Sequence, residues 1–263
     1  MKTGISTASL FGRYYTEDAL KILSDNKVET CEIFLESFCE YERSFGELLN
    51  SRKGDTEIHS IHTLTTQFEV QLYSLNDRAR KDSFALLENT MQAAEACGAK
   101  YYTFHGQARL KRTPITIDFE RYGNITRKIT EICASHGVTL AYENVHWAYY
   151  NYLGFFSELK KRVPKLRGTL DIKQARQSGV FYGDFIDEMG KDIVTAHLSD
   201  VDENGKMCLP GRGITDFEDV LKRLCDKGFD GALLLEVYKQ DFTELSELLD
   251  SMYYIKDLAE KIF

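Results

Sequence analysis

The feature that most constrains the fold of this chain is a regular alternation of short apolar runs with longer helical segments. The apolar runs are rich in β-branched and aromatic residues, as buried strands are. We expect eight strands, at residues 2–6, 30–35, 57–63, 100–104, 138–144, 166–172, 193–198 and 232–237. We expect helices from about residue 16 and at 41–52, 76–97, 119–135, 155–162, 184–189, 217–226 and 242–263.

Strands that alternate with helices pair in parallel through right-handed crossovers. Eight strand–helix pairs in 263 residues favour closure into a (β/α)₈ TIM barrel over an open doubly wound sheet, because such barrels typically have about 250 residues. No G-x-G-x-x-G motif follows the first strand, which argues against a dinucleotide-binding fold. We therefore expect a single α/β domain that spans residues 1–263.

Charge and composition disfavour several classes of function. The 41 acidic residues outnumber the 33 basic ones, and a net charge of −8 repels phosphate backbones, so we expect no nucleic-acid partner. We expect no membrane association, since no apolar run is long enough to span a bilayer and the first residues lack the apolar core of a signal peptide. The six cysteines form no C-x-x-C pair, and we expect a cytoplasmic protein.

The apolar run at 138–144 ends with a carboxylate, Glu143, and the next three strands end near Asp171, His197 and Glu236. In a (β/α)₈ barrel the C-terminal ends of the strands form one face, so these side chains should converge. Three buried carboxylates repel one another, and a divalent cation relieves that repulsion. Three oxygen ligands and one nitrogen ligand suit Mn²⁺ or Mg²⁺ and are compatible with Zn²⁺ or Co²⁺.

Five phrases around these residues match a known pattern. They are Leu-Ala-Tyr-Glu143-Asn, Thr-Leu-Asp171-Ile, Ala-His197-Leu-Ser-Asp, Pro210-Gly-Arg-Gly-Ile-Thr-Asp216 and Leu-Leu-Leu-Glu236-Val. The chain thereby resembles the xylose-isomerase-like barrel superfamily over almost its whole length, and within it the sugar and sugar-phosphate isomerases and epimerases. The resemblance implies one divalent metal ion, with Mn²⁺ as the first choice, held by Glu143, Asp171, His197 and Glu236.

The resemblance also implies a reaction on a small hydroxy-carbonyl compound, namely a sugar, a sugar phosphate or a related polyol-ketone. Of the two bases, Glu143 and Glu236, one would remove the proton α to the metal-bound carbonyl to give a cis-enediolate, and the other would face the opposite side. Return of the proton on the opposite face gives epimerisation, and return to the adjacent carbon gives isomerisation. Loss of a β-hydroxyl would make the protein an inosose dehydratase-type lyase, which is an alternative.

Two positions depart from the pattern of the epimerases. Gln174 stands three residues after Asp171, where those enzymes usually have a His, and Glu203 stands six residues after His197, where they often have an Arg. Arg212 is the nearest replacement cation. We expect it to bind a phosphate or carboxylate of the substrate, together with the N-terminus of the following helix.

The third and fourth expected strands end on His62 and His105, which we expect to contact the substrate. Both also match zinc-binding positions of the apurinic/apyrimidinic endonucleases, which this chain resembles as well and which bind three zinc ions. However, Gln174 replaces one expected His, and no Asp-x-His pair follows His197. These two departures argue against such a metal-dependent phosphodiesterase, which is therefore kept only as an alternative. A third hypothesis is a barrel that binds a sugar-like ligand without turnover.

Other polar and aromatic residues have simpler interpretations. We expect His59, His136 and His146 to be hydrogen-bonded structural residues, with His59 on the opposite side of its strand from His62. Glu36 is expected to be a solvated strand end. The aromatic segment 147–152 suits a sugar-stacking lid, a helix-packing patch or a subunit contact, so a homo-oligomer is compatible with the sequence.

Overall fold

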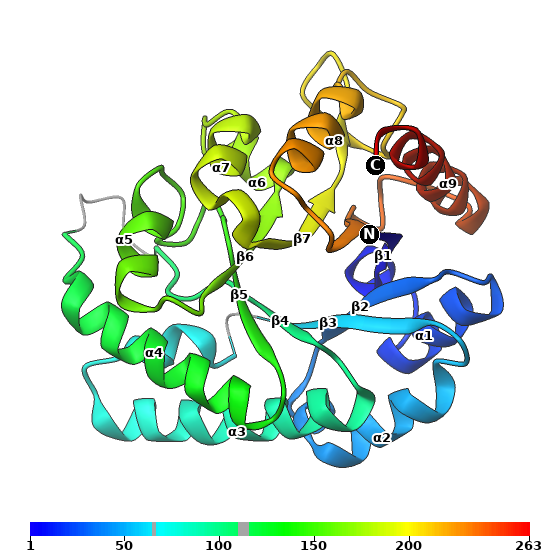
Figure 1. Cartoon of the computed structure of the whole chain (residues 1–263). Coiled ribbons are helices and arrows are strands. Elements are labelled where there is room, and N and C mark those ends of the chain that lie inside the picture. Colours follow the sequence, from blue (N-terminus) through cyan, green and yellow to red (C-terminus); the bar gives the residue numbers. More distant parts are fainter. Residues whose placement is uncertain (65–66, 110–115) are drawn as a thin grey trace.

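Parallel strands pair around a closed barrel in the order β1-β10-β7-β6-β5-β4-β3-β2 (Figure 1). The computed structural model describes residues 1–64, 67–109 and 116–263. The barrel strands are β1 (Lys2–Ser6), β2 (Thr30–Leu35), β3 (Glu57–Thr63), β4 (Tyr101–Phe104), β5 (Thr139–Glu143), β6 (Arg167–Asp171), β7 (Ile193–Leu198) and β10 (Ala232–Leu235). The predicted (β/α)₈ barrel is therefore confirmed.

Helices follow the strands and lie outside the barrel (Figure 1). The α-helices are α1 (Thr16–Asp25), α2 (Arg43–Arg52), α3 (Asp77–Cys97), α4 (Phe119–Ser135), α5 (Phe155–Arg162), α6 (Ile172–Gln177), α7 (Tyr182–Met189), α8 (Phe217–Asp226) and α9 (Leu245–Ile262). Asp118 and Asp216 are N-caps, as expected, because each side chain accepts a hydrogen bond from the backbone three residues later. Gly98 ends α3 in the left-handed conformation, with φ of 80°.

Several connections have more structure than the sequence predicted. The helix α6 was not predicted; it begins directly after β6, because the Asp171 side chain accepts a hydrogen bond from the Gln174 backbone and caps it. Two short strands, β8 (Asp200–Val201) and β9 (Met207–Cys208), form an antiparallel pair after β7. Within the described residues, further connections contain the 3₁₀ turns η1 (Thr7–Leu10), η2 (Phe38–Tyr41), η3 (Glu69–Tyr73) and η4 (Gly190–Asp192).

The apolar core lies between the barrel and the helices, while much of the barrel interior is polar. Leu20 of α1, Leu87 of α3 and Leu224 of α8 are fully buried. Inside the barrel, by contrast, hydroxyl groups of Ser60 and Thr103 donate hydrogen bonds to a buried carboxylate. Among the described helices, none is both long and apolar enough to cross a membrane.

The prediction that His59 lies on the opposite side of its strand from His62 is wrong. The register between β2 and β3 shifts, since Cys31 pairs with Ile58 but Glu32 pairs with Ser60, which leaves His59 as an extra residue. This bulge turns His59 into the barrel, where its Nε2 lies 2.9 Å from Oγ1 of Thr195 on β7. The histidine is buried and hydrogen-bonded, in keeping with the expected structural role.

We predict that His59 makes the stability of the fold depend on pH. Burial lowers the pKa of His59 to about 4, so the unfolded chain takes up a proton near pH 6.5 while the folded chain does not. The free energy of unfolding should therefore decrease as the pH falls from 6.5 to 4, by about 3 kcal/mol from this group. Urea unfolding of wild type and His59→Gln at several pH values measures the difference.

The matched control is His136→Gln, because Glu88 and Glu95, outweighing the effect of partial burial, raise the pKa of His136. The contribution of His136 to the free energy of unfolding should depend on pH in the opposite direction to that of His59. It is present at low pH and is lost as the pH rises through the raised pKa of His136. Identical pH dependence in wild type and His59→Gln would contradict the prediction.

Candidate functional site

The structure brings six predicted polar side chains together at the C-terminal end of the barrel. All six are at least nine-tenths buried. They are His62 on β3, His105 directly after β4, Glu143 on β5, Asp171 on β6, His197 on β7 and Glu236 directly after β10. Each stands where an apolar strand ends, so the buried run fixes the backbone and the pleat aims the side chain inward.

His197 lies between two of the carboxylates. Its Nδ1 is 3.2 Å from Oε1 of Glu143 and 3.1 Å from Oε2 of Glu236. Burial alone would lower the pKa of His197, but Glu236 and the other carboxylates around it raise the pKa well above its usual range. Conversely, burial would raise the pKa of Glu143, but His105 and His197 hold it well below its usual range.

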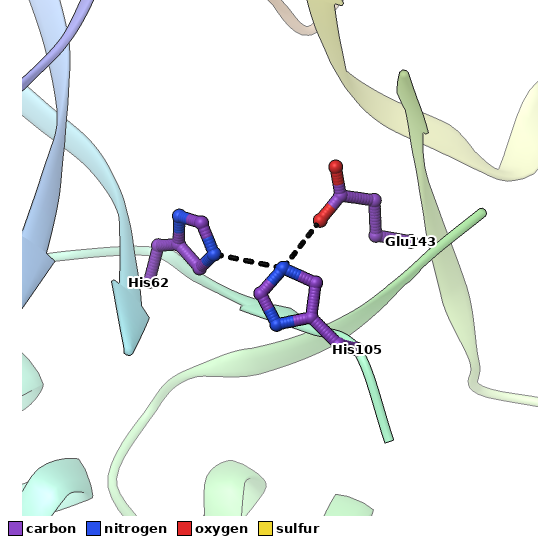
Figure 2. A group of neighbouring side chains, drawn as sticks. All are labelled: His62, His105 and Glu143. Atoms are coloured by element: carbon purple, nitrogen blue, oxygen red, sulfur yellow. Dashed lines mark hydrogen bonds and ion pairs between the residues drawn. The ribbon is translucent and has the colours of Figure 1, made fainter. Parts of the chain in front are cut away.

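Two further histidines extend this network on the side of β3 and β4. Figure 2 shows the rings of His62 and His105 facing each other, with the carboxylate of Glu143 beside them. The two Nε2 atoms are 2.9 Å apart, and Nε2 of His105 is 3.0 Å from Oε2 of Glu143. Against the effect of burial, Glu143 and Glu69 raise the pKa of His105 to about 10, while burial and His105 lower the pKa of His62. Nε2 of His105 thus faces both the ring of His62 and the carboxylate of Glu143.

Asp171 is held at the edge of the cluster by its neighbours. Its backbone N–H donates to Oδ1 of Asn144, and the Asn144 amide donates to the Asp171 carbonyl, each at 2.8 Å. This pair of hydrogen bonds ties the end of β6 to the chain just after β5. Burial raises the pKa of Asp171 to about 7, with Lys173 acting in the opposite direction.

Lys173 is a buried cation of the cluster that the sequence did not suggest. It is 5% exposed, and its Nζ lies 3.4 Å from Oε1 of Glu236 and 3.6 Å from Oδ2 of Asp171. Two carboxylates of the cluster are thus partly neutralised by the chain itself. The lysine follows Asp171 by two residues, and only the unexpected helix α6 turns it towards the site.

Glu32 is a second group that sequence reasoning missed. It lies in the middle of β2 with no exposure to solvent, and it accepts hydrogen bonds from Ser60 at 2.8 Å and Thr103 at 2.6 Å. Its Oε1 is 3.0 Å from Nε2 of His197. Although burial favours the neutral acid, His197 and its other partners keep the pKa of Glu32 well below its usual range. The carboxylate therefore fixes which nitrogen of His197 faces the cluster.

Glu69 plays a comparable part behind His105. Fully buried in η3, it accepts hydrogen bonds from Tyr102 at 2.6 Å, from Thr63 at 3.0 Å and from the His105 backbone at 3.1 Å. It also lies 3.4 Å from Nδ1 of His105. The ring of His105 is thus held between carboxylates on both nitrogens.

The residues that the sequence prediction missed, Glu32, Glu69 and Lys173, differ in whether a sequence pattern could have identified them. A single charge within the run Thr-Cys-Glu-Ile-Phe-Leu could have identified Glu32, since a charge inside a buried strand requires a partner. Only Glu36, which follows that strand, was predicted to have a role there, as a solvated strand end. Glu69 and Lys173 lie in a 3₁₀ turn and a short helix and carry no comparable pattern.

Arg212, the predicted substrate contact, is not joined to this cluster. Its side chain is half exposed and forms an ion pair of 2.7 Å with Glu247 on α9. The loop that carries it is organised by buried Asp200, whose carboxylate accepts four backbone hydrogen bonds, from residues Val201, Gly211, Gly213 and Thr215. Contact between Arg212 and a substrate would require the pair with Glu247 to open.

Different residues of the aromatic segment after β5 fit different predicted roles, namely a place beside the site and a place in the packing against a helix. The Trp147 ring lies 5.3 Å from the ring of His105 and so borders the cluster. Tyr150 is buried and stacks on Phe155, 5.1 Å away, as a packing residue. Directly before Trp147, His146 is held by Oε1 of Gln174, 2.5 Å from its Nδ1.

The donor atoms of the cluster fit a divalent metal ion. Three groups have ligand atoms within 4.8 Å of one another among the described residues: His62, His105 and Glu143; Glu32, His62 and Glu236; and Glu143, Asp171 and His197. Oδ2 of Asp171 is buried and accepts no hydrogen bond from the described residues, although Nζ of Lys173 lies 3.6 Å away. Carboxylate and imidazole donors that converge in this way suit Mn²⁺, Zn²⁺, Mg²⁺ or Co²⁺.

Comparison with known proteins places this fold among characterised barrels. Residues 20–258 match the family model described as the xylose isomerase-like TIM barrel. No curated protein matches the chain in sequence.

Solved structures share the fold over the full chain. A zinc-bound IOLI protein is 16% identical, with a TM-score of 0.81 over 100% of this chain and 99% of that chain. A D-psicose 3-epimerase solved in the presence of D-fructose is 14% identical, with a TM-score of 0.79 over 100% of this chain and 99% of that chain. A D-tagatose 3-epimerase-like protein is 18% identical, with a TM-score of 0.78 over 100% of this chain and 98% of that chain.

We predict that Glu32→Ala strongly destabilises the protein. The substitution removes the carboxylate that is paired with Nε2 of His197, and it leaves the hydroxyls of Ser60 and Thr103 buried without their acceptor. The free energy of unfolding should fall by about 3 kcal/mol or more. Glu36→Ala, at the partly exposed end of the same strand, should change it by less than about 1 kcal/mol. Equal effects of the two substitutions in urea unfolding would contradict the assigned role of Glu32.

Proposed function

Because this chain belongs to the xylose isomerase-like TIM barrel family, we propose that it is a metal-dependent isomerase or epimerase of a sugar, a sugar phosphate or a related polyol-ketone. The reaction is the transfer of a proton at the carbon beside the substrate carbonyl. Epimerisation and isomerisation both begin with this step, and they differ in where the proton returns.

The observation that carries the proposal is the convergence of two glutamates on one nitrogen. Glu143 and Glu236 lie 3.2 and 3.1 Å from Nδ1 of His197. They come from β5 and from the end of β10, which are separated in the barrel by β6 and β7. Two carboxylates that approach one point from separated strands can address opposite faces of a small substrate.

In the proposed site, Glu143, Asp171, His197 and Glu236 hold one divalent ion, with Mn²⁺ as the first choice and Zn²⁺, Mg²⁺ or Co²⁺ as alternatives. Such an ion, when bound, polarises the substrate carbonyl and makes the adjacent C–H more acidic. The ligand atoms of Glu143, Asp171 and His197, which lie within 4.8 Å of one another, support this assignment. The zinc in the IOLI protein supports a divalent ion in a barrel of this fold.

The remaining polar groups of the chain orient the substrate in this proposal. One of Glu143 and Glu236 accepts the proton and the other returns it. His62 and His105 hydrogen-bond substrate hydroxyls at the side of β3 and β4. Trp147 beside His105 offers an aromatic surface to the sugar carbons.

We predict that the protein exchanges the α-hydrogen of its substrate with solvent. In D₂O, NMR should show loss of the α-hydrogen signal from at least one member of a panel of ketoses, ketose phosphates and inososes. Glu143→Gln and Glu236→Gln should each lower the exchange rate by about 10³-fold or more, because each removes a base. Glu131→Gln, on the exposed face of α4, is the matched control and should not change the rate.

Exchange that persists in either variant would place the proton transfer on other residues. Loss of a β-hydroxyl instead of exchange would favour the dehydratase-type lyase. If no compound of the panel exchanges, a barrel that only binds its ligand becomes the better explanation.

We also predict the metal content. Elemental analysis of the purified protein should find about one divalent ion per chain, since the four proposed ligands form one site. About three zinc ions per chain would instead favour the endonuclease-like phosphodiesterase, in which His62, His105 and Glu143 would serve a further ion. Glu143→Gln and Asp171→Asn should each reduce the bound metal, and Glu131→Gln should not.

A further inference from the structure

A cavity of about 570 Å³ opens beside the carboxylate cluster, and nothing in the proposed reaction yet uses it. It lies next to the C-terminal ends of β6 and β7, between α6, the start of α7 and the β8–β9 hairpin. This volume falls within the range of about 300–1,000 Å³ that small-molecule sites occupy. Lys173 lines the cavity and also contacts Asp171 and Glu236, so the cavity adjoins the proposed metal site.

Ser199 supplies a buried polar group to the cavity wall. It is 3% exposed, and its Oγ has no hydrogen-bond partner among the described residues. A buried hydroxyl without a partner costs about 1–3 kcal/mol, which a bound acceptor would restore. Ser199 follows His197 by two residues, so a ligand of this hydroxyl lies close to the cluster.

Arg176 supplies a positive charge that the protein does not use. It lies on α6, lines the cavity and is exposed, and its guanidinium has no ion pair or hydrogen bond to any residue within 1–64, 67–109 and 116–263. Arg212, by contrast, is committed to Glu247. A guanidinium with five free donors is suited to a carboxylate or a phosphate.

The carboxylates of the acidic residues that line the cavity accept hydrogen bonds from backbone N–H groups. Asp200 accepts four backbone hydrogen bonds. Asp216 caps α8 by accepting the backbone N–H of Asp219 at 3.0 Å. Their charges are therefore partly compensated in place and do not bind Arg176.

We propose that this cavity is a subsite for an anionic group of the substrate, either a phosphate ester or a carboxylate, bound by Arg176 and by the hydroxyl of Ser199. The apolar wall, which includes Val180, Phe181 and Ile214, covers the carbon chain that leads to the anionic group. The inference rests on the proposed function and deepens it, because it makes the substrate a sugar phosphate or a sugar acid rather than a neutral sugar.

The test measures binding of inorganic phosphate and of acetate to the protein as isolated, by calorimetry at constant ionic strength. Arg176→Ala should weaken binding of at least one of the two anions about tenfold or more, the effect of losing a charge-assisted hydrogen bond. Arg78→Ala, which removes an exposed arginine on α3 outside the cavity, is the matched control and should leave binding unchanged. An effect on phosphate alone indicates a sugar phosphate, and an effect on acetate alone indicates a sugar acid.

Ser199→Ala separates ligand binding from folding. Removing a buried hydroxyl without a partner should leave the Tm unchanged or raise it, while anion binding weakens. If neither anion binds wild type more tightly than Arg176→Ala, the inference is overturned. A lower Tm in Ser199→Ala with unchanged anion binding would also count against it, because the hydroxyl would then be structural.

These measurements do not depend on turnover. Anion binding that requires Arg176, in a protein without α-hydrogen exchange, would leave the subsite standing and reject the proposed reaction. Exchange of the α-hydrogen without any Arg176-dependent anion binding would reject the subsite and leave the proposed reaction standing.

Discussion

The carboxylate of Glu32, enclosed at the centre of the barrel, is the group on which the arrangement of the site depends. It accepts hydrogen bonds from β1, β3 and β4 and lies against Nε2 of His197 on β7, so one side chain of β2 joins five strands. A fully buried carboxylate is tolerated only when its partners compensate for the lost hydration. Here the compensating histidine also meets Glu143 and Glu236 through its other nitrogen, so core and site are one network.

The same principle extends around the cluster. Glu69 lies behind His105, and Lys173 lies beside Asp171 and Glu236, so each charge faces an opposite charge from another element. Such contacts fix the rotamers of the inner groups before any ligand arrives. Oδ2 of Asp171 nevertheless accepts no hydrogen bond from the described residues. This oxygen belongs to the group of side chains at the mouth of the barrel, where a metal ion and a substrate are proposed to bind.

Much of the architecture could be predicted from local patterns. The barrel strands and most helices begin and end within a few residues of their predicted bounds, because periodicity and N-capping residues such as Asp118 and Asp216 act over short distances. Strand-end positions also identified the six side chains that meet at the barrel mouth. The inward turn of His59 could not be predicted, since it depends on a register shift between β2 and β3. Glu69 and Lys173 were missed because the turn and the short helix that carry them have no periodic pattern.

The sequence by itself determined the number and order of the barrel strands and which side chains stand at their C-terminal ends. These properties follow from hydrophobic alternation and the parallel geometry of βα units. Only the tertiary structure decided which polar side chains are paired across the barrel, as with His59 and Thr195, 136 positions apart. It also decided that Arg212 binds Glu247 while Arg176 and Ser199 face a cavity. Such pairings arise when the closed barrel brings distant strands within hydrogen-bond reach, and no local pattern in the sequence records that distance.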